Sequence, residues 1–165
     1  MRYKMGENTP KPHNVVPILT RKLLRNEQFT VYGSKYDTDD GTAVRDYIHI
    51  DDLVDAHELC LNRLDELTTL FGIEFFNIGS GVGSSINDVL RQMNRVVKIS
   101  PLQIRYEPNR PGDVAVLVSS IEKAKTVLGF VPKLSLFDIC RSAYDYDKVQ
   151  YEKSQRSIHE KSHSC

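Results

Sequence analysis

The fold class is decided by the stretch Ile73-Glu74-Phe75-Phe76-Asn77-Ile78, which runs directly into Gly79-Ser80-Gly81-Val82-Gly83-Ser84-Ser85. The apolar run predicts a short strand buried on both faces, and the glycines predict a tight turn after it. Ser85 and Asp88 have the spacing of a capping box, so a helix is expected to begin there. Its apolar face consists of Ile86, Val89, Leu90 and Met93. A strand that leads through a turn into a helix is typical of the α/β class.

Outward from this stretch, strands and helices alternate. The predicted helices are one over about 15–26 after Asn14, one that Asp51 caps and that carries Leu53, Ala56, Cys60 and Leu64, one from Ser119 with Glu122 to Gly129, and one opened by Ser135 with Asp138. The predicted strands are 29–32, 47–50, 73–78 and 102–107. Only 47–50 and 73–78 have the character of inner parallel strands, too few for a sheet covered on both faces. Either a partner supplies further strands or the chain is a piece of a larger protein.

The length of 165 residues suits a single domain, which we expect over residues 1–150. From residue 151 onward the sequence offers one isolated Ile158 and no periodic apolar face. A segment with so little to bury does not offset its conformational entropy. Residues 151–165 are therefore expected to form a disordered tail.

Composition and charge argue against several classes of protein. Lysine plus arginine and aspartate plus glutamate both number 22, and this zero net charge argues against a nucleic-acid binder. No apolar run approaches the roughly 20 residues that cross a bilayer, and Met1 leads into a polar segment rather than a signal peptide. Cys60, Cys140 and Cys165 fit no metal spacing and no disulfide framework. A cytoplasmic protein with reduced thiols is expected.

The glycine-rich turn invites comparison with a dinucleotide-binding loop, but its spacing argues against one. The order is Gly79-x-Gly81-x-Gly83 rather than GxGxxG, and no second strand ending in an acidic residue follows about 20 residues on. Two interpretations stay open: a tight connection between strand and helix, or a loop that closes over a ligand.

Two arginines stand in stretches that fix their position. Arg45 follows a glycine turn and precedes a predicted strand, beside Asp46. Arg110 lies in Pro108-Asn109-Arg110-Pro111-Gly112-Asp113, where two prolines restrict the backbone. A fixed guanidinium is suited to binding phosphate oxygens, and a carboxylate such as Asp113 to binding ribose hydroxyls. The alternative for the second stretch is an ordinary rigid turn.

His49 and His57 flank two aspartates, which raises the question of a metal site or a catalytic dyad. His49 is predicted to lie in a strand, and His57 lies one and a half turns into the next helix, so the two rings need not converge. No metal site is expected.

Several stretches together resemble one enzyme family. They are Pro12-His13-Asn14-Val15-Val16-Pro17, Thr30-Val31-Tyr32-Gly33, Asp40-Gly41-Thr42-Ala43-Val44-Arg45-Asp46-Tyr47-Ile48-His49, Phe76-Asn77-Ile78-Gly79-Ser80-Gly81 and Arg110-Pro111-Gly112-Asp113. The series resembles the C-terminal half of UDP-glucose 4-epimerase, an extended short-chain dehydrogenase/reductase, over about residues 5–150. The third stretch, continued by Asp52-Leu53, is specific to the epimerase branch, and the last is shared with sister dehydratases and decarboxylases. His13 and Ala43 stand where asparagine and glycine are common.

The resemblance implies substrate-binding roles for eight residues. They are Asn14 at a helix start on the phosphate and sugar side, Thr30 and Tyr32 beside uracil, Arg45 and Arg110 on the pyrophosphate, Ile86 on the nucleoside, Asp113 on the ribose and Leu117 at the sugar end. No catalytic, cofactor-binding or metal-binding residue is implied on this chain.

The resemblance also implies a fold and a cofactor. The fold is the C-terminal part of an NAD(P)-binding Rossmann-like epimerase with a small mixed α/β substrate-binding subdomain. The family's NAD loop and its Tyr-x-x-x-Lys pair belong to the N-terminal half. Tyr144 and Lys148 have that spacing but lie in the last predicted helix, where the family's pair does not lie. NAD is therefore expected on the N-terminal half and not on this chain alone.

The implied reaction is the NAD-dependent inversion of UDP-glucose and UDP-galactose at C4, in galactose metabolism, by enzymes that are often homodimers. A tyrosine takes the proton of the 4-hydroxyl group while NAD takes the hydride, and this chain would anchor the nucleotide. Two alternatives stay open. One is a related nucleotide-sugar dehydratase or decarboxylase, which the 40–49 stretch disfavours. The other is a non-catalytic truncated chain or pseudoenzyme, which the missing catalytic pair favours.

Overall fold

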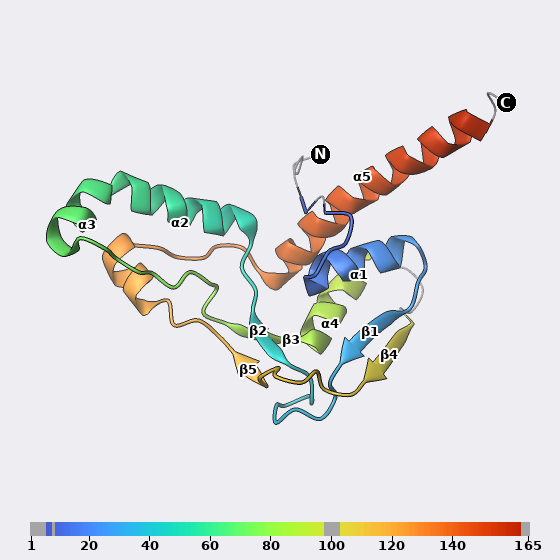
Figure 1. Ribbon diagram of the computed structural model, residues 1–165, viewed down its shortest axis with the longest axis horizontal. Helices are drawn as coiled ribbons and strands as arrows, with labels where there is room; N and C mark the ends of the chain where they lie inside the picture. The colour runs from blue at the N-terminus through green and yellow to red at the C-terminus, as the bar shows by residue number, and fades with distance from the viewer. Residues whose placement is uncertain (1–5, 8, 98–102, 163–165) are drawn as a thin grey trace.

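The computed structural model describes residues 6–7, 9–97 and 103–162. A small central sheet separates two groups of helices (Figure 1). None of the described helices is long and apolar enough to cross a membrane. The mixture of helices with parallel and antiparallel strand pairs confirms the predicted α/β class.

The central sheet has three short strands. Strand β2 (Val44–Asp46) lies in the middle, antiparallel to β3 (Gly83–Ser85) and parallel to β5 (Val116–Leu117). Arg45 is therefore opposite Ser84 on one side and Leu117 on the other.

A second sheet joins β1 (Phe29–Tyr32) to β4 (Ile104–Glu107) in parallel, and both strands lie within segments that the sequence predicted to be strands. In β1 the side chains of Phe29 and Val31 are buried, whereas Thr30 is half-buried and Tyr32 is exposed. Alternation along a strand thus places Thr30 and Tyr32 together on the face away from the core.

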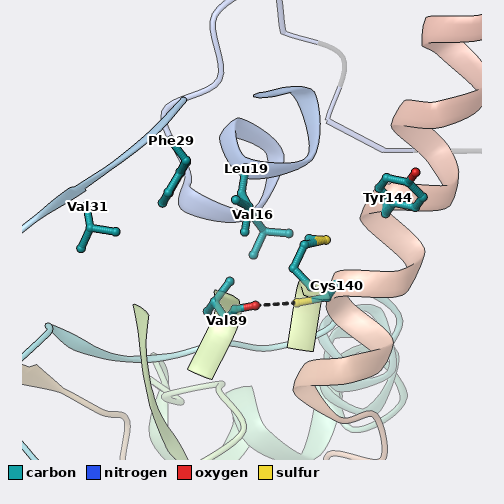
Figure 2. Packing of buried hydrophobic residues seen from close by; sticks show 8 residues of the cluster. Val16, Leu19, Phe29, Val31, Val89, Cys140 and Tyr144 are labelled. Carbon is teal, nitrogen blue, oxygen red and sulfur yellow. Dashed lines mark hydrogen bonds between the residues drawn. The ribbon is translucent and has the colours of Figure 1, made fainter. Parts of the chain in front are cut away.

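The first hydrophobic core lies between β1 and the helices α1 (Val15–Leu24), α4 (Ile86–Val97) and α5 (Leu136–Ser162) (Figure 2). Its buried side chains are Val16, Leu19, Phe29, Val31, Val89, Met93, Cys140 and Tyr144. Each fully buried side chain of this size contributes about 1.5–3 kcal/mol of transfer free energy. Burial also raises the pKa of the Cys140 thiol to about 12, so this cysteine packs as an apolar group.

A second, smaller core lies among helices α2 (Ile50–Asn62), α3 (Leu64–Phe71) and the π-helical turn η1 (Ala124–Leu128). Its buried side chains are Ala56, Leu67, Ala124, Leu128 and Phe130. The predicted end of η1 is confirmed, because Gly129 adopts φ 71° and its N–H donates to the carbonyl of Lys125.

The prediction of a strand over 47–50 is wrong. Strand β2 ends at Asp46, and helix α2 begins at Ile50. The cap is His49 rather than Asp51: the His49 ring accepts a hydrogen bond from the Asp51 N–H through Nδ1 at 3.1 Å. A histidine that satisfies a helix N–H starts the helix two residues earlier than the sequence pattern suggested. Leu64, expected on the same helix, begins α3 and is exposed.

The prediction of a strand buried on both faces over 73–78 is also wrong. These residues are extended, but no described strand pairs with them. Phe76 and Ile78 pack against the second core, whereas Ile73 and Phe75 are 75% and 79% exposed. A strand requires a hydrogen-bonded neighbour, and the described part of the chain supplies none here.

Two of the three predicted capping boxes are present. Ser85 and Asp88 exchange hydrogen bonds of 2.9 and 3.0 Å, and Ser135 and Asp138 exchange bonds of 2.9 and 3.3 Å. The third is absent, because the Ser119 N–H donates instead to the carboxylate of Asp46.

Helix α5 extends further toward the C-terminus than the sequence predicted. It continues through residues 151–162, which the sequence predicted to be a disordered tail, and its last part projects beyond the other elements (Figure 1). Residues 152–157 are exposed, in agreement with the absence of an apolar face. The first part of α5 packs in the first core through Cys140 and Tyr144, and the helix continues from there into exposed residues.

Candidate functional site

Arg45 lies at the centre of the three-stranded sheet with a half-buried side chain. Its Nη1 atom donates to the carbonyls of Val44 at 2.8 Å and Val114 at 2.9 Å, which ties the guanidinium to the start of β5. Nε and Nη2 form no hydrogen bond with any described residue, and no described carboxylate pairs with Arg45. The group is thus held in place with donors available to a ligand.

Arg110 is held differently. Its guanidinium lies over the ring of Tyr32, 3.9 Å from the centroid, and this cation–π contact joins the 108–113 loop to the end of β1. Within the loop, the Asp113 N–H donates to the Arg110 carbonyl at 3.2 Å, and Gly112 has φ 84°. As with Arg45, no described carboxylate forms an ion pair with Arg110.

The remaining predicted site residues lie at the edges of these elements. Asp113 is exposed and Leu117 is 62% exposed, while Tyr32 is 42% exposed on the outer face of β1. Ile86 is the first residue of α4, and its N–H donates to the Ala43 carbonyl, immediately before β2. The structure thus arranges Tyr32 with Arg110, Arg45 with Leu117, and Ile86 with the segment that leads to Arg45.

Asn14 stands apart from this group. It is the N-cap residue of α1, yet its side chain makes no cap bond and its Nδ2 lies 3.5 Å from Oε2 of Glu7. No hydrogen bond within the described ranges joins it to the other seven predicted residues.

Asp46 was not predicted as a site residue, yet its carboxylate collects the backbone N–H groups of Ser80, Gly81 and Ser119. Burial would raise the pKa of this carboxyl, but the hydrogen bonds from Ser80, Gly81 and Ser119 outweigh burial and hold it below its ordinary value. The glycine-rich loop therefore surrounds an internal anion. This geometry supports the tight-connection interpretation and opposes a dinucleotide-binding loop.

A second carboxylate organises the turn before β2. Oδ1 of Asp40 accepts bonds from the N–H and hydroxyl of Thr42 at 2.9 and 2.7 Å, and Oδ2 accepts from the Ser85 hydroxyl at 2.5 Å. Burial raises the pKa of Asp40, but these bonds more than offset it and the pKa is lowered. The network attaches the turn to the start of α4. Adjacency of Asp46 to Arg45 was the only sequence signal for either carboxylate.

The histidines do not form a joint site. Nε2 of His49 lies 2.9 Å from the Ser142 hydroxyl, whereas Nδ1 of His57 lies 2.7 Å from the carbonyl of Leu53 in its own helix. Within residues 6–7, 9–97 and 103–162, no group of three or more His, Cys, Asp or Glu could hold a metal ion. Tyr144 is buried in the first core with Lys148 exposed one turn on, which does not resemble a catalytic pair.

Two surface clefts lie elsewhere. One of about 310 Å³ is formed by the N-terminal segment, α1 and α5 around Arg21 and Tyr151. The other, of about 380 Å³, lies between α2 and the residues after η1, around Asp55 and Phe130. Neither is lined by any of the eight predicted residues.

Known proteins match most of this chain. A family model described as GDP-mannose 4,6 dehydratase matches residues 4–143. The UDP-glucose 4-epimerase of Rhizobium meliloti (strain 1021) is 38% identical over 144 residues, which make up 87% of this chain and 43% of that protein. The enzyme of the same name from Yersinia enterocolitica is 36% identical over 84% of this chain and 40% of its own length.

Solved structures agree. The UDP-glucose-4-epimerase from Stenotrophomonas maltophila with bound NAD and formylated UDP-arabinopyranose has a TM-score of 0.80 at 27% identity, over 89% of this chain and 43% of that one. The Bifidobacterium longum enzyme in complex with NAD+ and UDP has a TM-score of 0.74 at 30% identity, over 87% and 42%.

The chain thus spans less than half the length of the relatives it matches, and it corresponds to their C-terminal half. The predicted resemblance and the Rossmann-like fold of the relatives are confirmed. The Stenotrophomonas maltophila enzyme binds NAD and a UDP-sugar in its complex, and the Bifidobacterium longum enzyme binds NAD+ and UDP. The family model names a dehydratase, whereas these relatives are epimerases. Because its model matches residues 4–143, the chain belongs to the GDP-mannose 4,6-dehydratase family.

Proposed function

We propose that this chain is the nucleotide-sugar-binding part of a UDP-glucose/UDP-galactose 4-epimerase. The observation that carries the proposal is a pair of arginines that no described carboxylate pairs with, one held in the central sheet and the other over an exposed aromatic ring. Arg45 is fixed by the Val114 carbonyl, and Arg110 is fixed by the ring of Tyr32. Elsewhere in the described chain, arginines such as Arg63 and Arg105 pair with glutamates.

The residues divide the ligand among them. Arg45 and Arg110 would bind the pyrophosphate through charge-assisted hydrogen bonds. Thr30 and Tyr32 share a face of β1 and would contact the uracil, which would use the ring face that Arg110 does not cover. Asp113 would bind the ribose, Ile86 would contact the nucleoside and Leu117 would lie at the sugar. Asn14 would join the phosphate and sugar side at the start of α1.

NAD would be held outside this chain. The related structures contain it, but in the glycine-rich loop here the N–H groups of Ser80 and Gly81 donate to Asp46 and are not available to a pyrophosphate. Bound NAD would supply the hydride acceptor for inversion at C4. The contribution of this chain would be to bind and orient the nucleotide sugar.

The test is nucleotide selectivity. The matching family model is named for a GDP-sugar enzyme, whereas the similar proteins are named as UDP-glucose enzymes. Calorimetric titration of the full chain with UDP, UDP-glucose, GDP and GDP-mannose should show preferential binding of the two uridine nucleotides. Tighter binding of the guanine nucleotides would favour a dehydratase. No binding of any nucleotide would contradict the proposal.

A further inference from the structure

The carboxylate of Asp46 receives hydrogen bonds from two separate segments. Oδ1 accepts from the Ser80 N–H at 2.7 Å and from the Ser80 hydroxyl at 2.5 Å. Oδ2 accepts from the N–H groups of Gly81 and Ser119, both at 3.2 Å. Four donors match the roughly four lone-pair positions of an ionised carboxylate.

These bonds begin where the strand pairing ends. Asp46 is the last residue of β2, opposite Gly83 of β3, and the paired part of β5 ends at Leu117. The strands have three, three and two residues, so few ladder bonds fix their register. The side chain of Asp46 therefore attaches β2 to both of its neighbours beyond the paired residues.

Arg45 and Leu117 depend on this attachment. They are partners in the parallel pair of β2 and β5, and at the other end the Arg45 guanidinium binds the Val114 carbonyl. Asp46 fixes the opposite end through Ser119. A shift of one residue would turn Leu117 to the other face of the sheet and separate it from Arg45.

Two glycines of the loop allow the backbone to lie beside this carboxylate. A Cβ atom at Gly79 would overlap Oδ2 of Asp46, and Gly81 has φ 70°, a conformation that favours glycine. Close approach to an internal anion thus explains the glycine at position 79, whereas a Cβ atom at Gly83 would overlap the side chains of Val44 and Val118.

We propose that Asp46 is a positioning residue of the nucleotide-sugar site. By holding residues 79–81 and Ser119 against β2, it places Arg45 for the pyrophosphate and Leu117 for the sugar. Asp46 itself touches neither. This inference rests on the proposed function and adds to it the residue that organises the phosphate and sugar end.

The test uses Asp46→Asn in the full chain. Asparagine keeps the size of the side chain, but an NH₂ group in the position of Oδ2 faces the N–H groups of both Gly81 and Ser119. Hydrogen exchange at both amides should accelerate, and affinity for UDP-glucose should fall about tenfold, as for one lost charge-assisted bond. Ser80→Ala, which removes only the hydroxyl donor, should produce a smaller change in the same direction. Asp39→Asn, an exposed carboxylate in the nearby turn, is the matched control and should change neither.

A comparison with UMP separates positioning from general destabilisation. UMP lacks the second phosphate and the glucose of UDP-glucose, so Asp46→Asn should weaken UMP binding less than UDP-glucose binding. Equal losses for both ligands, or unchanged UDP-glucose affinity in a folded Asp46→Asn variant, would overturn the proposal. If that variant does not fold, Ser80→Ala decides, and unchanged exchange and affinity overturn it. A wild-type chain that binds no UDP-glucose would instead refute the proposed function.

Discussion

Arg45 and Arg110 should each contribute to the affinity for UDP. Each guanidinium is held by the protein without an ion pair to a described carboxylate, so its loss removes ligand contacts together with the bonds of Arg45 to the Val44 and Val114 carbonyls or the contact of Arg110 with the Tyr32 ring. Arg45→Ala or Arg110→Ala should weaken binding by about 1.5–3 kcal/mol, the range of a hydrogen bond to a charged group. Calorimetric titration with UDP measures this. Arg141→Ala, an exposed arginine of α5, is the control, and unchanged affinity in both site variants would mean that the site lies elsewhere.

Asp46 also makes stability depend on pH. Its pKa in the folded chain lies below the value of about 3.9 expected for an unfolded aspartate. The carboxylate therefore contributes stability above about pH 3.9, and this contribution is lost as pH falls through the folded pKa. Urea unfolding of wild type and Asp46→Asn at a series of pH values should show their difference in unfolding free energy shrinking on acidification.

Asp147 provides a comparison of opposite sign. Burial raises the pKa of Asp147. The Thr20 hydroxyl and Arg21, whose Nε lies 3.8 Å from Oδ1, lower this pKa but do not offset burial. Its contribution is present below the unfolded pKa and is lost as pH rises through the folded pKa. Wild type should therefore lose stability relative to Asp147→Asn as pH rises. A pH dependence of the same sign for the two aspartates would contradict one of the two assignments.

For single residues, the sequence predicted local backbone conformation better than it predicted hydrogen-bond partners. The conformational restraint around Arg110 was readable because prolines and glycine act on their immediate neighbours. The network of Asp46 was not, since its donors are 34 and 73 positions away along the chain. Only the fold brings Ser80 and Ser119 to the same carboxylate.

Among the elements, the same contrast explains which predictions succeeded. The capping boxes at Ser85 and Ser135 depend on bonds that span three residues, and both were correct. The strand over 73–78 failed because pairing depends on a neighbour that an apolar pattern does not reveal. The strand over 47–50 failed because a histidine ring replaced the expected aspartate as the helix cap.

Helix α5 should be cleaved first near its C-terminal end. Residues 152–157 are exposed, and backbone hydrogen bonds within a helix that lacks tertiary contacts open readily. Limited trypsin digestion should cut after Lys153 and Arg156 before it cuts in α1 or α4. Mass spectrometry should compare how early two kinds of fragment appear. One kind is released by cleavage after Lys153 or Arg156, and the other by cleavage after Arg21, whose side chain binds the N-terminal segment. Earlier cleavage at Arg21 would show that the end of α5 is protected.

For the whole molecule, exposed apolar surface predicts self-association of the isolated chain. Ile73 and Phe75 are the most exposed large apolar side chains, and Ile50, Val54 and Leu61 add an apolar stripe along α2. Phe75→Ser should reduce association in sedimentation velocity at matched concentrations. Phe76→Ser, which instead removes a ring packed against the second core, should not, because it loosens the fold. An unchanged degree of association in Phe75→Ser would place the contact on another surface.

The chain alone should not epimerise a nucleotide sugar. The related complexes contain NAD, whereas the one glycine-rich loop between Ile78 and Ile86 directs its donors to Asp46. The only Tyr-x-x-x-Lys spacing joins a tyrosine buried in the first core to an exposed lysine, and the absence of a positioned base costs about 10²–10⁴-fold by itself. With NAD and UDP-galactose, a coupled assay should detect no UDP-glucose above the protein-free control. The Rhizobium meliloti epimerase, of which this chain matches 43%, is the positive control. Turnover by residues 1–165 alone would require a base and a place for the hydride acceptor within this chain, and would overturn the proposal that this chain only binds and orients the nucleotide sugar.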